Sequence, residues 1–444
     1  MNQRNPAISK GIDWVLIWLY LAFVTIGLIS IFSVAYREGD NVLQSFLGFK
    51  TVYSKQFYYF IIALILGLFI LLTDSKFFTA TANIWYIVGI GLLLLVFPFH
   101  TKIKGTESII RFGGIQIQPA EMCKVFVCLA LAKYLSRVET DFSKPKSQLT
   151  AAAIVLLPAL MSIAQKETGL ALVFFAFFLV MFREGLPAGY LIVGFSLAVL
   201  VVATLLVEKN LLAIILTGIA LFTIFILRRH IKRNKGVLVL ILLLWGACVG
   251  IQRFAVPFIF TKVLANHQVE RIFSLIGREN PYAQLNSVDE EEPAVKKKDV
   301  DYNVRQSKIA IGSGGVFGRG FLKGTQTRFD FVPEQQTDFI FCTIGEGFGF
   351  VGCALVLGIY LFFLLKVINI AERQRSVFSR CYAYGVAAVF FFHIAINVCM
   401  TIGLAPVIGI PLPFISYGGT SLLTFSVMLF ILVRLDADRQ MILR

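Results

Sequence analysis

Two ionisable residues inside an apolar stretch are the first candidates for chemistry in this sequence. Glu121 and Lys124 lie three positions apart in the run 119–136, so on a helix they share a face and can neutralise each other. Gln118-Pro119 puts a proline at the first helical position, which places Glu121 in the first turn, near the positive end of the helix dipole. The pair is expected to line a polar cavity that faces the outer leaflet, or to act as a buried ion pair that only fixes helix packing.

Asp338 is the second candidate, at the junction between a long polar segment and an apolar run that starts at 339. A partly desolvated carboxylate binds a proton more readily, which suits a general base that takes a proton from a substrate hydroxyl. An Asp that follows Thr is also common at helix N-termini, so a capping role is the alternative.

Four cations with few acidic neighbours lie in the polar segment before Asp338, at Lys308, Arg319, Lys323 and Arg328. They could hold a pyrophosphate group at the lipid surface, although general binding of anionic lipid headgroups is the more common explanation for such a cluster. The glycine-rich stretch 312–320 is similar to a phosphate-binding loop only in part, because it lacks the final Gly-Lys-Ser/Thr. No nucleotide site is expected there.

Polar and helix-breaking residues also interrupt the C-terminal apolar runs. His393 and Asn397 lie four positions apart, and an intramembrane histidine is usually hydrogen-bonded to a neighbouring helix, so no catalytic role is assigned to them. Prolines and glycines in 403–413 exclude a continuous helix. The backbone there must be buried in protein or line a cavity, and we expect it to form a pocket wall.

The composition predicts a membrane protein, because 57% of the 444 residues are hydrophobic, more than a soluble domain hides in one core. Runs of about 18 or more apolar residues are each long enough to cross the hydrocarbon layer as a helix. We expect an all-α polytopic membrane protein, a single domain over 1–444 with about twelve transmembrane helices and a long extracytoplasmic loop at 259–337. The predicted spans are 13–35, 55–73, 82–99, 119–136, 148–165, 168–184, 188–207, 210–228, 237–258, 339–366, 381–404 and 412–434.

The net charge of +15 is carried mainly by short runs between apolar spans, so membrane topology explains it and no nucleic-acid partner is expected. Lys and Arg in the turns 228–235 and 373–380 predict that these turns are cytoplasmic. Both termini then lie in the cytoplasm, and 259–337 lies outside. Within that loop, 279–298 is expected to be a flexible insertion. Seven cysteines inside or beside apolar spans predict neither a disulfide framework nor a zinc site.

Several motifs in order along the chain resemble the SEDS family of bacterial membrane proteins. They are Gln118-Pro119-Ala120-Glu121, Asn303 to Ile311, Lys323-Gly324-Thr325-Gln326-Thr327, Val332 to Phe341, and Gly409 to Gly419. The Lys323 to Thr327 motif, followed by Phe331-Val332-Pro333-Glu334, looks like the elongation branch of the family rather than the division branch.

The resemblance implies a peptidoglycan glycosyltransferase of the bacterial cytoplasmic membrane, with its active site facing outward. It would polymerise lipid II into glycan strands, release undecaprenyl pyrophosphate and act in cell elongation with a class B penicillin-binding protein. No cofactor is implied beyond a possible divalent cation, Mg or Mn. Asp338 would be the essential carboxylate, Glu121 and Lys124 would line the central cavity, and Arg271 would lie near the substrate path. The predicted binding set also contains Lys308, Lys323, Arg328, Glu334 and Thr337.

The sequence departs from the family pattern in three places. The spans within 188–228 are a predicted two-helix insertion, Gln165-Lys166-Glu167-Thr168-Gly169-Leu170 stands where Gln-Pro-Asp-Leu-Gly-Thr is usual, and Gly347 replaces a second glutamate after Glu346. Twelve spans, the Glu121 and Lys124 pair and the broken helix at 403–413 also suit a flippase for lipid-linked precursor, which is the alternative function. A scaffolding subunit is the third possibility, and it predicts that substitutions of Asp338 and Glu121 leave function intact.

Overall fold

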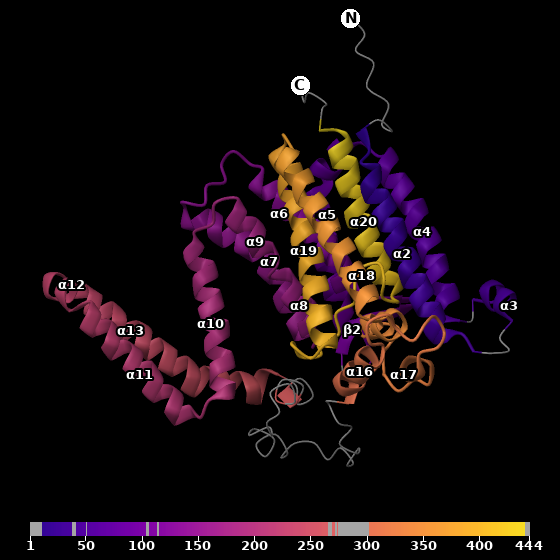
Figure 1. Ribbon diagram of the computed structural model, residues 1–444. Coiled ribbons are helices and arrows are strands. Elements are labelled where there is room, and N and C mark those ends of the chain that lie inside the picture. The colour runs from indigo at the N-terminus through magenta and orange to yellow at the C-terminus, as the bar shows by residue number, and fades with distance from the viewer. Residues whose placement is uncertain are drawn as a thin grey trace, which may run out of the picture. The chain divides into compact units, whose positions relative to one another are not determined.

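The computed structural model describes residues 11–37, 41–49, 51–103, 106–112, 115–264, 269–270, 273 and 302–439. The chain divides into two compact units, one formed by Met1–Leu186 with Asn303–Arg444 and the other by Pro187–Tyr302. Figure 1 shows the helices of both units along the chain. The predicted loop segment 279–298 and its charge run 289–298 lie outside the described residues.

The first unit is a helical bundle that contains all the described candidate site residues. In Figure 1, α2, α4, α18, α19 and α20 run side by side. The longer helices are α2 (Trp14–Ala35), α4 (Val52–Leu72), α5 (Ser75–Phe99), α6 (Pro119–Leu135), α7 (Pro145–Ala164), α18 (Ile340–Arg373), α19 (Val377–Thr401) and α20 (Gly419–Ala437). The shorter ones are α3 (Val42–Leu47), α8 (Thr168–Phe174), α9 (Phe177–Arg183), α16 (Tyr302–Ser313) and α17 (Thr325–Arg328).

Helix α6 is the most enclosed part of this bundle, packed between α5, α7, α19 and α20. Its small side chains, among them Ala120, Cys128 and Ala132, allow neighbouring backbones to approach closely. Gly385 of α19 shows how close this approach is, because any Cβ at that position would overlap the Cys128 sulfur. The helix that carries Glu121 and Lys124 is therefore held on several sides.

The longer helices of the second unit are apolar and their side chains are largely exposed, as expected for surfaces that face lipid. Its elements are α10 (Ala188–Leu206), α11 (Lys209–Ile226), α12 (Arg228–Arg233), α13 (Gly236–Gly250), η1 (Ile251–Ala255), α14 (Val256–Phe258) and η2 (Ile259–Val263). Polar contacts join α11 to α13 and η1: Trp245 donates to the Thr217 hydroxyl at 3.2 Å, and Gln252 donates to the Lys209 carbonyl at 2.6 Å. The predicted status of 188–228 as an insertion stays a prediction.

Ten described helices are long and apolar enough to cross a membrane. Each of the twelve predicted spans overlaps helical residues, but the span 168–184 is divided into the short helices α8 and α9, and α6 has only 17 residues. The count of twelve is therefore not established. Helix α18 spans 34 residues, but the non-helical backbone of Gly349 interrupts it, so it is not one continuous helix. Helix α20 begins at Gly419 rather than at 412.

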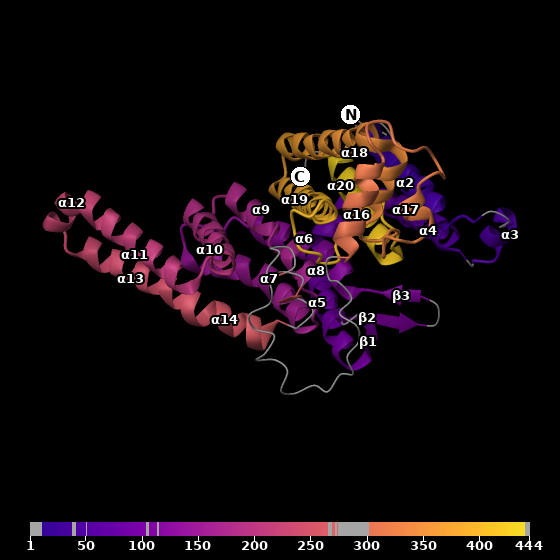
Figure 2. The same ribbon diagram turned by 60° about the horizontal axis from the view of Figure 1, so that its bottom comes forward.

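A small antiparallel sheet, absent from the all-helical expectation, follows α5. Its strands β1 (Thr101–Ile103), β2 (Thr106–Phe112) and β3 (Ile115–Ile117) pair in chain order, and Figure 2 shows them side by side. The register pairs Ile110 with Ile117 and Arg111 with Gln116. Contacts to the turn 165–167 anchor the sheet, because the Glu107 N–H donates to the Gln165 carbonyl at 3.2 Å and Lys166 pairs with the Glu107 carboxylate at 2.9 Å.

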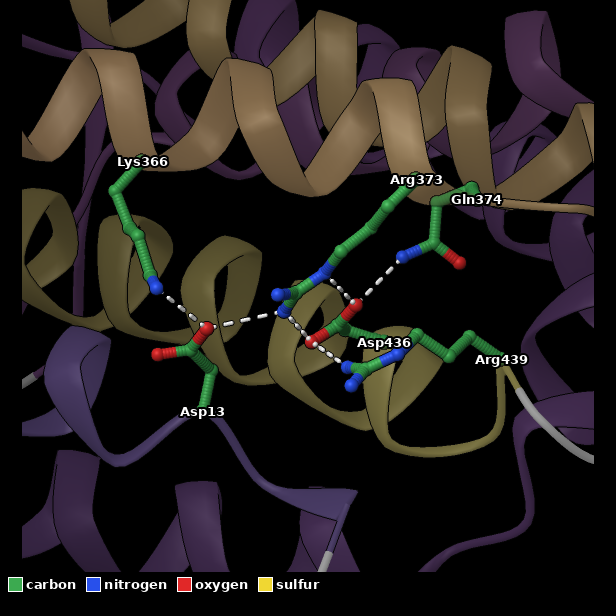
Figure 3. A network of polar contacts seen from close by, with 6 residues as sticks. All are labelled: Asp13, Lys366, Arg373, Gln374, Asp436 and Arg439. Carbon is green, nitrogen blue, oxygen red and sulfur yellow. Dashed lines mark hydrogen bonds and ion pairs between the residues drawn. The ribbon is translucent and has the colours of Figure 1, made fainter.

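An ion network joins three helix ends at one end of the first unit (Figure 3). Asp13, just before α2, pairs with Lys366 and Arg373 of α18, each at 3.0 Å. Arg373 also binds the fully buried Asp436 of α20. The start of α2 and the end of α20 therefore lie together, at the end of α18 that is far from Asp338.

Candidate functional site

Asp338 lies in a series of turns just before α18, and its carboxylate is half-buried. Because these turns precede the helix, the carbonyls of residues 336, 337 and 338 bond with another segment instead of within a helix. The carbonyls of Gln336, Thr337 and Asp338 accept hydrogen bonds from the Tyr417 N–H at 2.8 Å, the Ser416 hydroxyl at 2.6 Å and the Asn397 amide at 2.8 Å. The backbone that carries Asp338 is thus fixed by α19 and by the loop before α20.

That loop, 402–418, is non-helical, which confirms the break predicted from its prolines and glycines. Gly409 has φ +71°, a left-handed conformation that favours glycine. A Cβ placed there would lie 3.5 Å from Oδ2 of Asp338. The loop therefore leaves room next to the carboxylate where a side chain would stand.

The glycine-rich stretch 312–320 packs against a break in α18 at Gly349, which has φ +65°. A break frees backbone groups that must find partners at membrane depth. The N–H groups of Phe350 and Val351 donate to the carbonyls of Gly315 and Val316, at 2.9 and 3.1 Å. In the other direction, the N–H groups of Arg319 and Gly320 donate to the carbonyls of Glu346 and Gly347, both at 2.9 Å. These glycines therefore allow close backbone packing on α18.

Glu346 of α18 is fully buried and holds the segment that carries two of the predicted cations. Its carboxylate accepts hydrogen bonds from the Gln326 N–H at 2.8 Å, the Thr327 N–H at 2.9 Å and the Thr327 hydroxyl at 2.8 Å. Sequence reasoning noted Glu346 only as the neighbour of an unusual Gly347. The rule that flags ionisable residues within apolar spans would have found it, because it lies inside the predicted span 339–366.

The predicted cations differ in their surroundings. Lys323 is exposed and Lys308 lies against Gly403 of the broken loop; neither has an ion-pair partner within the described part of the chain. Arg328 is half-buried and donates to the Leu322 carbonyl at 3.2 Å, while Arg319 donates to the Thr325 hydroxyl at 2.7 Å. Arg271 lies outside the described residues.

Glu334 and Thr337 bond to each other within the turn before Asp338. The Thr337 hydroxyl donates to Oε2 of Glu334 at 3.0 Å, and the Thr337 N–H donates to the Glu334 carbonyl at 3.1 Å. Glu334 has φ +57°, which makes this a strained turn for a residue with a side chain. These hydrogen bonds shape the turn that precedes Asp338.

Glu121 and Lys124 form the ion pair that their spacing predicts, at 2.6 Å, with 1% and 0% of each residue exposed. Lys124 Nζ also lies 2.8 Å from Nε2 of His393 and 5.0 Å from the centre of the Phe425 ring. Helices α19 and α20 therefore cover the pair. The expectation that His393 is hydrogen-bonded to a neighbouring helix is confirmed.

The unusual turn 165–167 retains a buried carboxylate. Glu167 is 7% exposed and accepts a hydrogen bond from the Ser108 hydroxyl at 2.7 Å, and Gln165 donates to the Leu93 carbonyl at 2.8 Å. The turn is thus anchored to β2 and α5, although its sequence departs from the family pattern.

Comparison with known proteins identifies relatives of the whole chain. The family of FtsW, RodA and SpoVE cell cycle proteins matches residues 13–233 and 190–441. The peptidoglycan glycosyltransferase RodA of Treponema pallidum (strain Nichols) is 31% identical over 442 residues, which cover 96% of this chain and 97% of the relative. The peptidoglycan glycosyltransferase MrdB of Escherichia coli (strain K12) is 27% identical over 80% of this chain and 78% of its own length.

Two solved structures share the fold. A chain of a peptidoglycan synthase complex that coordinates polymerization and crosslinking has a TM-score of 0.66 and 23% identity, covering 97% of this chain and 99% of that one. The rod shape determining protein RodA of Thermus thermophilus has a TM-score of 0.60 and 22% identity, covering 97% and 98%. On this evidence of sequence and fold, the chain belongs to the FtsW, RodA and SpoVE family of cell cycle proteins, the SEDS family, and is a multi-pass membrane protein.

Proposed function

We propose that this protein polymerises lipid II into glycan strands for cell elongation and rod shape, with Asp338 as its general base. Relatives that match most of the chain are named as peptidoglycan glycosyltransferases, which supports the reaction class, and a solved structure with the same fold is a rod shape determining protein. The observation that carries the residue assignment is the fixed backbone of Asp338, held through three carbonyls next to the side-chain-free Gly409. A general base needs such a fixed position to meet the proton that it removes.

In the proposed step, Asp338 takes the proton from the 4-hydroxyl of the acceptor N-acetylglucosamine. The hydroxyl oxygen attacks the anomeric carbon of the donor N-acetylmuramic acid, and the bond from that carbon to undecaprenyl pyrophosphate breaks with inversion. Negative charge grows on the departing oxygens, so cations close to them stabilise the transition state. Lys323 and Arg328 suit this role, because both lie on the segment that Glu346 fixes to α18.

A divalent cation, Mg²⁺ or Mn²⁺, is the alternative to Lys323 and Arg328 for compensating the charge of the departing pyrophosphate. Among the described residues, no group of three His, Cys, Asp or Glu side chains is placed to hold a metal ion. Mg²⁺ does not require such a group, because it is commonly held by one or two carboxylates together with substrate phosphates.

The proposed orientation places Asp338 outside the cytoplasmic membrane and both termini in the cytoplasm. Support comes from the Lys- and Arg-rich turns at 228–235 and 373–380. The proposed partner is a class B penicillin-binding protein, supported by the fold shared with a chain of a peptidoglycan synthase complex. The flippase alternative is not favoured, because Glu121 and Lys124 are buried against each other instead of lining an open path.

The test is polymerisation of labelled lipid II by purified protein in liposomes, with and without the cognate penicillin-binding protein inactivated for transglycosylation. Loss of a general base typically lowers the rate about 10² to 10⁴-fold, which we expect for Asp338→Asn. Asp141→Asn is the matched control, because Asp141 is an exposed carboxylate in the loop between α6 and α7. Near-normal turnover by Asp338→Asn would refute the base, and lipid movement between leaflets without any strands would support the flippase.

A further inference from the structure

His393 is a buried titratable residue that the proposed reaction does not use. Its ring is 0% exposed, and each of its nitrogens has a polar neighbour. Nε2 lies 2.8 Å from Nζ of Lys124 in α6, and Nδ1 lies 3.2 Å from the carbonyl oxygen of Pro411 in the loop before α20. His393 therefore touches both the buried ion pair and the loop beside Asp338.

The chemistry of the two neighbours fixes which atoms donate. A carbonyl oxygen can only accept, so Nδ1–H donates to Pro411, and Nε2 of the neutral ring is left as an acceptor. The Lys124 ammonium then donates to Nε2 and to the Glu121 carboxylate, which lies 2.6 Å away. Phe425 packs edge-on against the His393 ring at 4.8 Å and limits its rotation.

One helical turn after His393, Asn397 continues this connection to Asp338. The Asn397 amide donates to the carbonyls of Ile410 and Asp338, at 2.7 and 2.8 Å. Ile410 and Pro411 are adjacent, so α19 holds this part of the loop at two neighbouring carbonyls. A continuous path of hydrogen bonds and backbone thus joins Glu121 and Lys124 to the backbone of Asp338.

We propose that His393 is a positioning residue for the glycosyltransferase reaction, coupling the Glu121 and Lys124 pair to the loop that fixes Asp338. The proposal rests on the proposed function. It predicts that activity depends on the two hydrogen bonds of the ring, whereas a packing role predicts that activity depends on its volume and aromatic contact with Phe425.

Three substitutions separate these roles. His393→Phe keeps the ring volume and loses both hydrogen bonds. The Asn side chain in His393→Asn places an amide near the position of Nδ1 and can restore the contact with Pro411. The longer side chain in His393→Gln reaches the position of Nε2 and can restore the contact with Lys124.

For polymerisation in liposomes, we expect His393→Phe to lower kcat about 10 to 100-fold, because small displacements of catalytic groups cost rates of this size. We expect KM within about threefold of wild type, since His393 places the catalyst and does not bind substrate, and His393→Asn and His393→Gln should each recover part of kcat. The opposite order, with His393→Phe within about twofold of wild type and Asn and Gln more impaired, would show packing alone and overturn the proposal.

Hydrogen–deuterium exchange of the purified protein supplies a readout that does not need turnover. Peptides covering 407–418 should exchange faster in His393→Phe than in wild type, and His393→Asn should restore slow exchange. Unchanged exchange in His393→Phe would overturn the coupling even if kcat fell. If the wild type made no strands, the proposed function would fail, while the exchange data would still decide whether His393 fixes the loop.

Discussion

Glu346 accepts hydrogen bonds from both the backbone N–H and the hydroxyl of Thr327, at 2.9 and 2.8 Å. Glu346 is fully buried near the N-terminus of α18, the helix that begins just after Asp338. This contact fixes the segment that contains Lys323 and Arg328 to the helix next to the proposed base. We therefore expect the distance between Asp338 and these two cations to depend on Glu346.

Replacing Glu346 with Gln should disturb this segment without removing a cation. In the variant, the side-chain NH₂ group of the glutamine would replace one carboxylate oxygen and would face a backbone N–H of Gln326 or Thr327. That N–H would lose its acceptor, and a buried donor without an acceptor costs about 1 to 3 kcal/mol. We expect KM for lipid II to rise several-fold and kcat to fall about tenfold, measured in the liposome assay. Glu139→Gln, an exposed carboxylate elsewhere, is the matched control. Unaltered KM and kcat for Glu346→Gln would show that the cation segment keeps its place without this contact.

The buried pair of Glu121 and Lys124 can be tested by a double-mutant cycle. Removing one partner leaves an uncompensated buried charge, so Glu121→Gln and Lys124→Met should each destabilise the protein by about 3 to 5 kcal/mol. The double variant should lose less than the sum of the two, as measured by thermal unfolding in detergent. If the stable double variant also polymerised lipid II at the wild-type rate, the pair would serve helix packing and not the reaction.

Structural features that depend only on residues close together in the chain could be predicted from the sequence. The i, i+3 spacing of Glu121 and Lys124 predicted their ion pair, and the prolines and glycines of 403–413 predicted the break. The sheet at 101–117 was missed because its strands are short and the first has only three residues. A strand of three residues is too short to show an alternation of apolar and polar residues, so hydrophobic periodicity does not reveal it.

Contacts between distant segments could not be predicted. The partner of His393, Lys124, lies 269 positions away in the chain, and no periodicity within α19 indicates which helix it faces. The partners of Glu346 could not be predicted either. They depend on how the glycine-rich stretch 312–320 packs against the break in α18 at Gly349. The sequence marked these side chains as costly to bury, but only the packing of helices shows what satisfies them.

Asp13 should make stability depend on pH in the acid range. Burial raises the pKa of its carboxyl, but hydrogen bonds and charge interactions with Lys366 and Arg373 outweigh burial, so its pKa lies below the ordinary value of 3.8. A carboxylate with a lowered pKa in the folded state stabilises the protein above its ordinary pKa and loses this contribution as pH falls through the lowered value. We expect wild type to unfold at a higher temperature than Asp13→Asn at pH 6, and the difference to shrink below about pH 4. A difference that stayed constant from pH 6 to pH 3 would contradict this assignment.

Gly409 offers the sharpest test of the space beside Asp338. Its φ of +71° strains any side chain, and an added Cβ would lie 3.5 Å from Oδ2 of the carboxylate. Gly185 also has a positive φ, +108°, but a Cβ there would have no neighbour within 4 Å. Both Gly→Ala variants should therefore lose about 1 kcal/mol of stability from backbone strain.

Only Gly409→Ala should lower kcat, by about tenfold or more, because it narrows the space in which the acceptor hydroxyl must meet Asp338. Equal kcat values for the two variants in the liposome assay would place the reacting hydroxyl on another side of the carboxylate.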